Sequence, residues 1–426
     1  MGTPVVFVTG WNPTHGKGGG SAYVRAHMRA AMRAGYEPHV FCLDAGSGTR
    51  EESFGAVHRV VPAPPFRRAL AAAAAGTARS FLAHWFHGFA FSPYNSVSHA
   101  ARLAAAIERF LAGRSGPHVI HGFYTWGNVG LRVRARLRGA GCAAVNSIYT
   151  TARHEAEGKV RGAAGARPQQ RALFGAERLW IHGVVRRQER RVYRHSNLVL
   201  VNYDAVRRRL LAEHGTGAET RKVPYCAESA FFDPAPLPDR PDADDPLVVS
   251  VSRHDPRKGV DVLVRALAAL RERGVRFRAC LVSGGPLLES HRRLAAELCL
   301  DDTTTLTGWV ENARPYFGRA EVFVLPSLQE GSGSLSLLEA MQAGAAIVAS
   351  NVDGIPEDVA DGESALLVPA GDADALSRAI ERLLASAELR RRLGAAARAT
   401  QIARFSPDAF AAAIGAVYAG LGCESG

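Results

Sequence analysis

Two glutamates bracket a glycine- and serine-rich stretch in the C-terminal half of the chain. Glu330 follows the apolar run EVFVLPS, which predicts a buried strand, and Glu339 lies in LSLLEAMQAG, which predicts a helix ending at a glycine. A carboxylate accepts hydrogen bonds from two neighbouring hydroxyl groups, so Glu339 is suited to a diol. The start of this helix would direct backbone N–H groups toward a phosphate. These N–H groups belong to Gly331, Ser332, Gly333, Ser334 and Leu335.

Two cations occur five residues apart in a second loop, SRHDPRKGVDVL, which follows another predicted strand. Arg253 and Lys258 precede Gly259 and a predicted helix. Two converging cations suit a diphosphate, which gathers negative charge as it leaves. Two exposed surface cations are the alternative interpretation. At the ends of the next two strands, LVSGGP and LTGWV contain glycines that let a ligand approach the backbone closely. The candidate contacts there are Gly285, Trp309 and Val310.

A third glycine-rich loop, WNPTHGKGGGSAYV, follows the first predicted strand. It places Gly18, Gly19 and Gly20 before a helix expected to begin near Ser21, so bare N–H groups could face an anion or sugar hydroxyls. It is not a Walker A loop, because Lys17 is followed by glycine and not by Ser or Thr. A simple turn is the alternative.

Strand-like and helix-like segments alternate in both halves of the chain, which predicts parallel sheets covered by helices on both faces. The expected fold is α/β: two Rossmann-like domains whose sheets face each other across a cleft, with ligand loops at the carboxyl ends of the strands. The Pro- and Asp-rich DPAPLPDRPDADDP predicts a linker at 233–246, between an N-terminal domain at 1–232 and a C-terminal domain at 247–405. The last helix, within 406–426, is expected to pack back on the first domain.

Composition limits the class of protein. The 426 residues are 47% hydrophobic and 22% charged, as in a globular protein. The net charge of +12 divides into +20 for residues 1–222 and −8 for residues 223–426. The basic half could face anionic substrates, a membrane or nucleic acid, or could be a solvated arginine-rich surface. Nucleic-acid binding is disfavoured, because the basic run at 178–194 contains only Trp180 and Tyr193 as aromatic residues.

The cysteines and the first residues bear on the compartment. Six cysteines are scattered without a CxxC pair, which favours reduced thiols over disulfide or metal roles. The start MGTPVVFVTG has no basic n-region and predicts a first strand instead of a signal peptide. No stretch approaches the roughly 18 apolar residues of a membrane span. We therefore expect a cytoplasmic protein.

Together, the C-terminal motifs resemble those of a known family. SRHDPRKGVDVLVRAL, LVSGGP, TGWV and VLPSLQEGSGSLSLLEAMQAG look like the retaining GT-B glycosyltransferases of family 4. The resemblance is strong from about residue 246 to 404. It is looser in the N-terminal half, where GGGSAYVRAHMRAAMRAGYEPHVF and KVPYCAESAFFDP are its clearest pieces.

The resemblance implies a role for each motif residue. Arg253 and Lys258 match the pair that grips the donor diphosphate, Glu339 matches the glutamate that binds the ribose, and Glu330 matches the one that contacts the donor sugar. No metal is implied, so cations and helix dipoles would stabilise the leaving diphosphate. One departure concerns the two glutamates: eight residues separate them here, and the family usually has seven.

The acceptor side is less defined by the resemblance. The family often carries a histidine just after the strand that here reads NSIYT; this sequence offers His154, and His121 in VIHGFYTWGN is the other candidate. A lone histidine is more often structural than catalytic.

The implied activity is transfer of a sugar, with retention, from a nucleotide-diphosphate donor to an acceptor hydroxyl. A UDP-linked donor and a small hydrophilic acceptor are favoured. The sequence of EGSGSLSLLEAMQAG is similar to that of aminoglycoside-pathway sugar transferases, whose acceptor would be an aminocyclitol. A peripheral membrane enzyme acting on a glycolipid or polysaccharide precursor is the alternative, and a non-catalytic nucleic-acid-binding protein is a remote one. No cofactor is expected beyond the donor substrate, and the chain is expected to be a monomer or homodimer.

Overall fold

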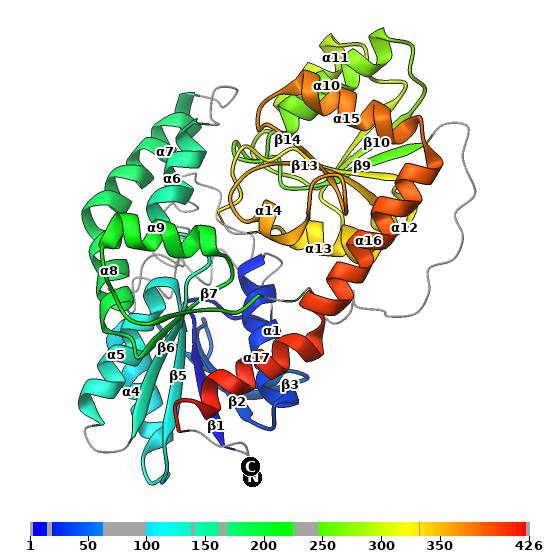
Figure 1. Ribbon diagram of the computed structural model, residues 1–426. Helices are drawn as coiled ribbons and strands as arrows, with labels where there is room; N and C mark the ends of the chain where they lie inside the picture. Colours follow the sequence, from blue (N-terminus) through cyan, green and yellow to red (C-terminus); the bar gives the residue numbers. More distant parts are fainter. Residues whose placement is uncertain are drawn as a thin grey trace. The chain divides into compact units, whose positions relative to one another are not determined.

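The computed structural model describes most of the chain, and everything below refers to those residues. They are 3–14, 19–62, 99–137, 141–161, 168–224, 226, 246–331 and 333–422. The chain divides into two compact units (Figure 1). The first comprises Met1–Ala152, Trp180–Glu228 and Pro407–Gly426, and the second Arg153–Leu179 and Ser229–Ser406.

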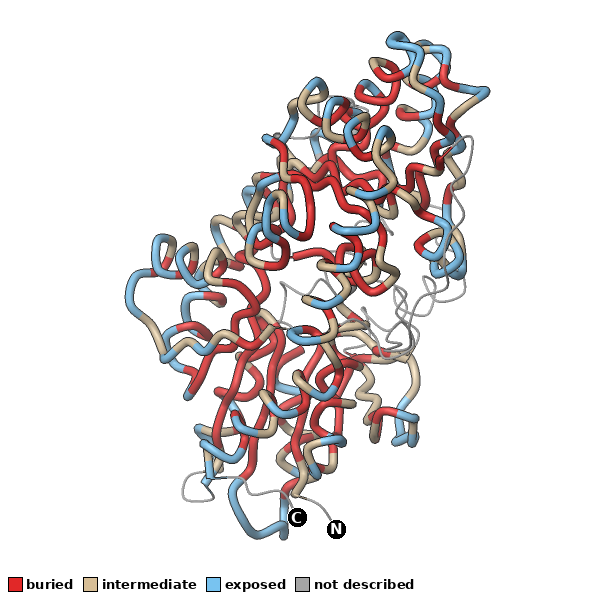
Figure 2. The backbone as a smooth tube through the Cα atoms, turned by 45° about the vertical axis from the view of Figure 1, so that its right-hand side comes forward, coloured by how far each residue is buried: buried red, intermediate tan, exposed pale blue. Residues whose placement is uncertain are grey.

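The first unit is built on an eight-stranded sheet in the order β3-β4-β2-β1-β5-β6-β7-β8. Neighbouring strands are parallel, except that β3 runs antiparallel to β4. The central strands are apolar and buried, as strands covered on both faces must be (Figure 2). The strands are β1 (Pro4–Val8), β2 (Glu37–Leu43), β3 (Gly48–Glu52), β4 (Gly55–Val60), β5 (His118–Phe123), β6 (Cys142–Ser147), β7 (Leu198–Val201) and β8 (Thr220–Lys222).

Helices cover both faces of this sheet. They are α1 (Gly19–Arg33), α4 (Ala100–Leu111), α5 (Gly127–Arg136), α8 (Arg186–His195) and α9 (Asp204–His214), with a 3-10 turn at Tyr124–Trp126 and a π-helical turn at Ile181–Val185. The last helix, α17 (Pro407–Ala419), lies along α1. The ring of Phe410 on α17 meets the ring of His27 on α1 edge-on, with centroids 4.9 Å apart.

The second unit holds a six-stranded parallel sheet in the order β11-β10-β9-β12-β13-β14. The strands are β9 (Leu247–Val251), β10 (Arg278–Val282), β11 (Thr304–Gly308), β12 (Val322–Leu325), β13 (Ala346–Ser350) and β14 (Leu366–Val368). The helices that follow them are α10 (Val260–Glu272), α11 (Leu288–Glu297), α12 (Arg314–Arg319), α13 (Leu335–Gln342), α14 (Ile355–Asp358), α15 (Ala373–Leu384) and α16 (Ala387–Phe405).

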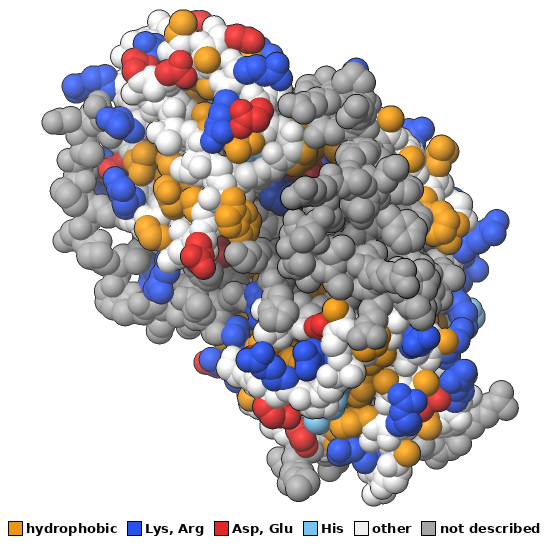
Figure 3. Space-filling model, turned by 180° about the vertical axis from the view of Figure 1, so that it is seen from behind, with side chains coloured by type: hydrophobic (Ala, Val, Ile, Leu, Met, Phe, Trp, Pro, Cys, Tyr) orange, Lys and Arg blue, Asp and Glu red, His pale blue; other side chains and the backbone are white. Residues whose placement is uncertain are grey.

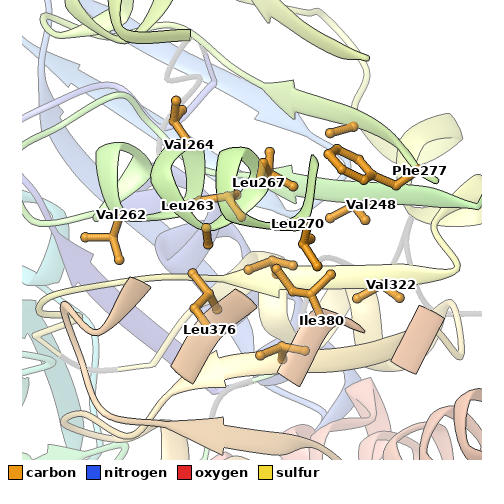
Figure 4. Close-up of a cluster of buried hydrophobic side chains, with 14 of the residues drawn as sticks. Val248, Val262, Leu263, Val264, Leu267, Leu270, Phe277, Val322, Leu376 and Ile380 are labelled. Atoms are coloured by element: carbon orange, nitrogen blue, oxygen red, sulfur yellow. The ribbon is translucent and has the colours of Figure 1, made fainter. Parts of the chain in front are cut away.

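The core of the second unit forms where α10 and α15 pack together on this sheet. Leu263, Leu267 and Leu270 project from α10 toward the strands and toward α15 (Figure 4). Their spacing of three to four residues places them on one helix face, as the apolar pattern of the sequence predicts. Leu376 and Ile380 of α15 complete the cluster. Burying each of these side chains contributes about 1.5–3 kcal/mol to folding.

The division of the chain differs in one respect from the sequence prediction, which assigned all of 1–232 to the first domain. Helices α6 (Ala152–Arg161) and α7 (Pro168–Trp180) follow β6 of the first sheet, yet residues 153–179 group with the second unit. The reason lies in side-chain contacts between α6 and loops of the second unit, described below. Of the predicted linker at 233–246, only Pro246 is among the described residues.

Two surface properties bear on the function classes considered from the sequence. Among the described residues, no helix combines the length and apolar character that a membrane span requires. On the face shown in Figure 3, Lys and Arg side chains are dispersed over both units, with Asp and Glu among them. The described residues on that face form no continuous basic track of the kind that nucleic-acid backbones require.

Candidate functional site

The loop after β9 and the loop after β12 meet in the second unit because of the strand order. From β9 the chain passes to β10 on one side, and β12 pairs with β9 on the other, so the strand order reverses between β9 and β12. Ligands of open α/β sheets bind in the crevice at such a switch point. The loop at 252–259 carries Arg253 and Lys258, and the loop at 326–334 carries Glu330. The carbonyl of Arg257 accepts hydrogen bonds from Leu328 N at 2.8 Å and Gln329 N at 3.1 Å, which ties the two loops together.

Gly259 is required where the first of these loops enters α10. Its φ is +60°, in the left-handed region that favours glycine. A Cβ at this position would also lie 2.1 Å from the carbonyl oxygen of Pro326 in the other loop. The glycine therefore allows the turn and the close approach of the two loops at once.

Lys258 and Glu330 form the central ion pair of the site. Lys258 Nζ lies 2.7 Å from both Glu330 Oε1 and Oε2, and the Ser327 hydroxyl donates to Oε1. The Glu330 side chain is 2% exposed and that of Lys258 is 18% exposed. An ammonium has three donors and a carboxylate about four acceptor positions, so each partner keeps capacity for a ligand.

Arg253, the other predicted cation, lies in a different environment. Its side chain is 66% exposed, and its contact with Asp255 Oδ2 is a loose one at 3.9 Å. Asp255 instead organises the loop, because Oδ1 accepts from Arg257 N at 3.1 Å and from its Nε at 3.2 Å. The sequence treated Arg253 and Lys258 as equivalent; the structure separates a solvated cation from a largely buried one.

Glu339 and the helix start follow the sequence prediction in secondary structure. α13 begins at Leu335, with extended backbone at Ser334, and Glu339 lies half-buried in its second turn. Gly331 adopts φ +73°, in the left-handed region that favours glycine. Gly331 N, however, donates to Asp353 Oδ2 at 3.0 Å, so it does not point to an open phosphate position. Ser332 lies outside the described residues, and Gly333 follows it in the loop.

The glycine-containing loop after β10 contacts the loop at 252–259, and the loop after β11 lies against the loop after β10, because a Cβ on Gly284 would lie 3.4 Å from Trp309 N. His254 N donates to Gly284 O at 3.0 Å, and a Cβ on Gly285 would lie 2.5 Å from His254 O. Trp309 follows β11 and exposes much of its ring, and Val310 beside it is half-buried. The His254 ring is buried against His291, with their Nδ1 atoms 2.9 Å apart, and burial lowers the pKa of His254 to about 3.

In the first unit, the predicted glycine loop is only partly within the described residues. Gly18 lies outside them, whereas Gly19 and Gly20 form the start of α1, two residues earlier than the sequence predicted. A Cβ on Gly20 would lie 3.2 Å from the ring of Trp11, which shows that this end of α1 packs tightly on the loop after β1. The first N–H groups of any helix lack intrahelical partners, so these glycines remain candidate anion donors.

His121 of β5, a predicted acceptor-side residue, is completely buried. Its Nδ1 lies 2.7 Å from the Tyr418 hydroxyl of α17, and its Nε2 lies 2.7 Å from the Ser147 hydroxyl of β6. Burial lowers its pKa well below the ordinary value for histidine. Both ring nitrogens are engaged inside the core, so this histidine holds α17 to the sheet and offers neither nitrogen to a ligand.

A second buried histidine, His27 of α1, joins the same cluster. Its Nδ1 donates to the Tyr23 carbonyl at 2.8 Å, which makes Nε2 the acceptor of the neutral ring. The Tyr149 hydroxyl therefore donates to Nε2, at 3.0 Å. Burial lowers the pKa of His27 to about 4, so the ring is neutral near pH 7.

His154, the other predicted acceptor-side histidine, lies on α6 and contacts Asp353 and Gln329 in the loops after β13 and β12. Its Nε2 is 3.2 Å from Asp353 Oδ2, and its carbonyl accepts from the Gln329 side chain. Asp353 also accepts from Glu330 N at 2.8 Å. Asp353 and Gln329 were missed by the sequence reasoning. Asp353 could have been found as a polar residue in NVDGIPED, directly after a buried strand.

Two further features of the first unit could bind ligands. Glu189, Glu213 and His214 form a group that could hold a metal ion, although Glu189 already accepts from His214 at 2.8 Å and from Ala152 N at 3.0 Å. A cavity of about 500 Å³ also opens between α4 and the β3–β4 hairpin. Three of its lining residues are arginines, and its described lining includes no carboxylate. The main lining residues are Phe41, Thr49, Arg59, Val60, Arg102 and Arg109.

Comparison with solved structures defines the class. Sucrose-phosphate synthase from Thermosynechococcus elongatus is 24% identical, with a TM-score of 0.74 over 98% of this chain and 99% of that one. HepE of Anabaena, solved with UDP, is 14% identical, with a TM-score of 0.68 over 98% of this chain and 100% of that one. At these identities the likeness establishes the fold, and the two parallel-sheet units are those of a GT-B protein.

The family follows from two family models. Glycosyltransferase Family 4 matches residues 17–226, and Glycosyl transferases group 1 matches residues 238–400. Together they account for most of both units. The chain belongs to the family 4 GT-B glycosyltransferases, as the resemblance of its motifs indicated.

Several relatives are named as sugar transferases of different kinds. The GDP-mannose-dependent alpha-(1-6)-phosphatidylinositol monomannoside mannosyltransferase of Mycolicibacterium smegmatis is 31% identical over 55% of this chain and 65% of that protein. The alpha-D-kanosaminyltransferase of Streptomyces kanamyceticus is 30% identical over 55% of this chain and 63% of that protein. A lipopolysaccharide core glycosyltransferase, LpsE of Rhizobium meliloti, is 34% identical over 39% of this chain and 48% of that protein. The matches thus span about half to two thirds of these relatives' lengths.

Proposed function

We propose that this protein transfers a sugar from a nucleotide-diphosphate donor to an acceptor hydroxyl, with retention of anomeric configuration. The observation that carries the proposal is the Lys258–Glu330 pair at the switch point of the second unit. Lys258 has one ammonium donor left for a phosphate oxygen, and its charge stabilises the leaving diphosphate. Arg253, solvated at the mouth of the same loop, reaches the diphosphate from outside.

The two glutamates then serve opposite ends of the donor. Glu339 binds the ribose hydroxyls from the second turn of α13, and the remaining acceptor position of Glu330 meets the donor sugar. The N–H groups of Leu335 and Ser336, at the start of the helix, face the diphosphate between them. We name no protein nucleophile: the departing phosphate takes the proton of the attacking hydroxyl on the same face.

The identity of the nucleotide base in the donor is the first property to determine. The motif resemblance favoured UDP, whereas relatives such as the mycobacterial mannosyltransferase are named GDP-mannose-dependent. Isothermal titration with UDP, GDP, ADP and dTDP identifies the base, and the anomeric coupling constant of the product tests retention by NMR. A chain that binds none of the four nucleotides overturns the proposal.

Metal independence belongs to the same proposal, because Lys258, Arg253 and the helix dipole supply the positive charge that a metal would otherwise provide. Activity is expected to survive exhaustive EDTA. Loss of activity in EDTA, restored by magnesium or manganese, contradicts this part of the mechanism and leaves the sugar transfer itself in place.

For the acceptor, the motif resemblance favours a small aminocyclitol. A second candidate, an anionic glycolipid bound at a membrane surface, is favoured by the cavity of the first unit. Three arginines over an apolar floor suit a phosphate-bearing amphiphile, and they repel an amine-bearing acceptor. Flotation with anionic and neutral vesicles at low and high salt separates the two. The Arg102→Ser, Arg109→Ser double variant should lose only the salt-sensitive binding to anionic vesicles.

A further inference from the structure

Asp353 occupies an unusual place in the loop between β13 and α14. Its φ is +50°, a left-handed conformation that is uncommon outside glycine and is tolerated best by Asn and Asp. Its side chain is 9% exposed. A buried, ionisable residue in this conformation needs partners that hold it there.

The partners are two consecutive N–H groups of the donor loop. Asp353 Oδ2 accepts from Glu330 N at 2.8 Å and from Gly331 N at 3.0 Å. Successive N–H groups converge on one anion when the second residue is left-handed, as Gly331 is with φ +73°. The Asp353 carboxylate thus fixes the backbone of Glu330, while Lys258 and Ser327 fix its side chain.

The same oxygen receives a third contact, from His154 Nε2 at 3.2 Å. A carboxylate only accepts, so the histidine donates through Nε2–H, and its tautomer in the neutral state is set by this contact. His154 is itself anchored to the loop, because its carbonyl accepts from the Gln329 side chain.

Helix α6 carries His154 and packs closely on the donor loops. A Cβ on Gly158 would lie 1.9 Å from Gln329 Oε1, so a larger residue at this position would displace the end of the Gln329 side chain. One turn earlier, Glu155 lies 3.6 Å from Arg257, whose carbonyl holds the start of the Glu330 loop. Residues on one face of α6 therefore contact both loops of the switch point.

We propose that Asp353 and His154 are positioning residues for the donor sugar. They act through the backbone of Glu330 and Gly331, and hold the Lys258–Glu330 pair in the orientation that faces the reacting bond. This inference rests on the proposed function and goes beyond it, because the resemblance to the family assigns no role to Asp353 and no positioning role to His154. Misplacing reacting groups by about 1 Å lowers the rate by about 100-fold, so a positioning residue affects turnover more than binding.

A matched pair of substitutions isolates the hydrogen bonds from the backbone strain. Asp353→Gly and Asp353→Asn both tolerate the left-handed φ, but only Asn keeps an oxygen that can accept. Asp353→Gly is expected to lower kcat at least about tenfold, while the nucleotide dissociation constant changes less than about threefold. Asp353→Asn is expected to lie between wild type and the glycine variant. His154→Ala should lower kcat less than Asp353→Gly does. His154→Gln, which retains a hydrogen-bond donor, should have a higher kcat than His154→Ala.

Hydrogen exchange supplies a readout that does not depend on activity. Amide exchange in the peptide covering 326–336 should be at least about tenfold faster in Asp353→Gly than in Asp353→Asn, because only the former leaves the N–H groups of Glu330 and Gly331 without an acceptor. Glu157→Gln, on the same helix and paired with Arg153 at 2.7 Å, serves as the control and should match wild type in both measurements.

The outcomes separate the inference from the proposed function. Wild-type protein that binds no nucleotide overturns the proposed function, whereas the exchange measurement still tests the role of Asp353 in the loop. If both Asp353 variants exchange like wild type, or exchange faster but retain wild-type kcat, the positioning role is wrong.

Discussion

The two units have similar sheets, but different kinds of side chain lie at their switch points: aromatic in the first unit and charged in the second. Each sheet has a switch point, which lies between β1 and β5 in the first unit and between β9 and β12 in the second. In the first unit, the position beside the switch is filled by Trp126, and a Cβ on Gly10 would lie only 2.0 Å from its indole ring. In the second, the Lys258–Glu330 ion pair occupies the equivalent position.

The comparison shows that the strand order sets the position of the switch point, and that the side chains there determine whether it is apolar or charged. Behind the switch of the first unit, the buried histidines His27 and His121 are neutral, because burial lowers their pKa values. In the second unit, Lys258 and Glu330 instead face each other as an ion pair, with Lys258 Nζ 2.7 Å from both carboxylate oxygens. The first arrangement fills a core and anchors α17, whereas the second places charged side chains at the switch point.

The largest expected effect is that of removing the charged partner in the second unit. Lys258→Ala should lower kcat at least about 100-fold, the scale of one lost donor to developing charge, and should raise KM for the donor less. Arg253→Ala should cost only about tenfold, because its guanidinium is solvated and screened. Steady-state kinetics with varied donor measures both.

A double variant controls for the buried carboxylate that Lys258→Ala leaves unpaired. Lys258→Met combined with Glu330→Gln removes both charges, so it should recover much of the stability lost in Lys258→Ala and remain inactive. Equal losses of kcat in the Lys258 and Arg253 single variants would contradict the distinction between the two cations.

Matched glycine substitutions test the two switch points directly. Gly259→Ala and Gly10→Ala each introduce a methyl group into occupied space, and each should lower the free energy of unfolding by about 1–3 kcal/mol. Only Gly259→Ala should also weaken nucleotide binding, because it separates the two donor loops. Urea unfolding and calorimetry are the measurements. Loss of nucleotide affinity in Gly10→Ala would show that the switch of the first unit also serves the donor.

The neutral histidines predict acid sensitivity. His27 has a pKa of about 4 in the folded chain and about 6.5 when unfolded, so between these values the unfolded state binds more protons. The free energy of unfolding therefore falls as the pH drops through this window, by about 2 kcal/mol from His27 alone between pH 7 and pH 5. In His27→Gln, the difference between urea unfolding at the two pH values should shrink by about that amount. If the free energy of unfolding of His27→Gln changes between the two pH values as much as that of wild type, groups other than His27 cause the acid sensitivity.

The smallest expected effect concerns the nucleotide alone. Glu339→Ala should weaken nucleotide binding at least about tenfold, or 1.4 kcal/mol, the scale of one charge-assisted hydrogen bond. Stability should be nearly unchanged, because the side chain is only half-buried on the surface of α13. Unchanged affinity by calorimetry, in a folded variant, would remove the ribose role.

Much of the fold could be predicted because it depends on local patterns. Apolar runs located β1, β9 and β12, and helical periodicity with a terminal glycine located α13 at Leu335. The alternation of these elements implied parallel sheets, and motif spacing led to the family. Each of these signals lies within a few tens of residues, where chain connectivity keeps the pattern intact.

The sequence by itself thus determined the GT-B architecture and the residue types of the donor loops, whereas the tertiary structure decided which of those residues act together. His154 meets Asp353 across 199 positions, and His121 meets Tyr418 across 297. No periodicity spans such separations, because these contacts depend on how whole elements pack. Burial distinguishes residues that look alike in the sequence. Lys258 is largely buried whereas Arg253 is exposed, and His121 lies in the core whereas His154 contacts Asp353.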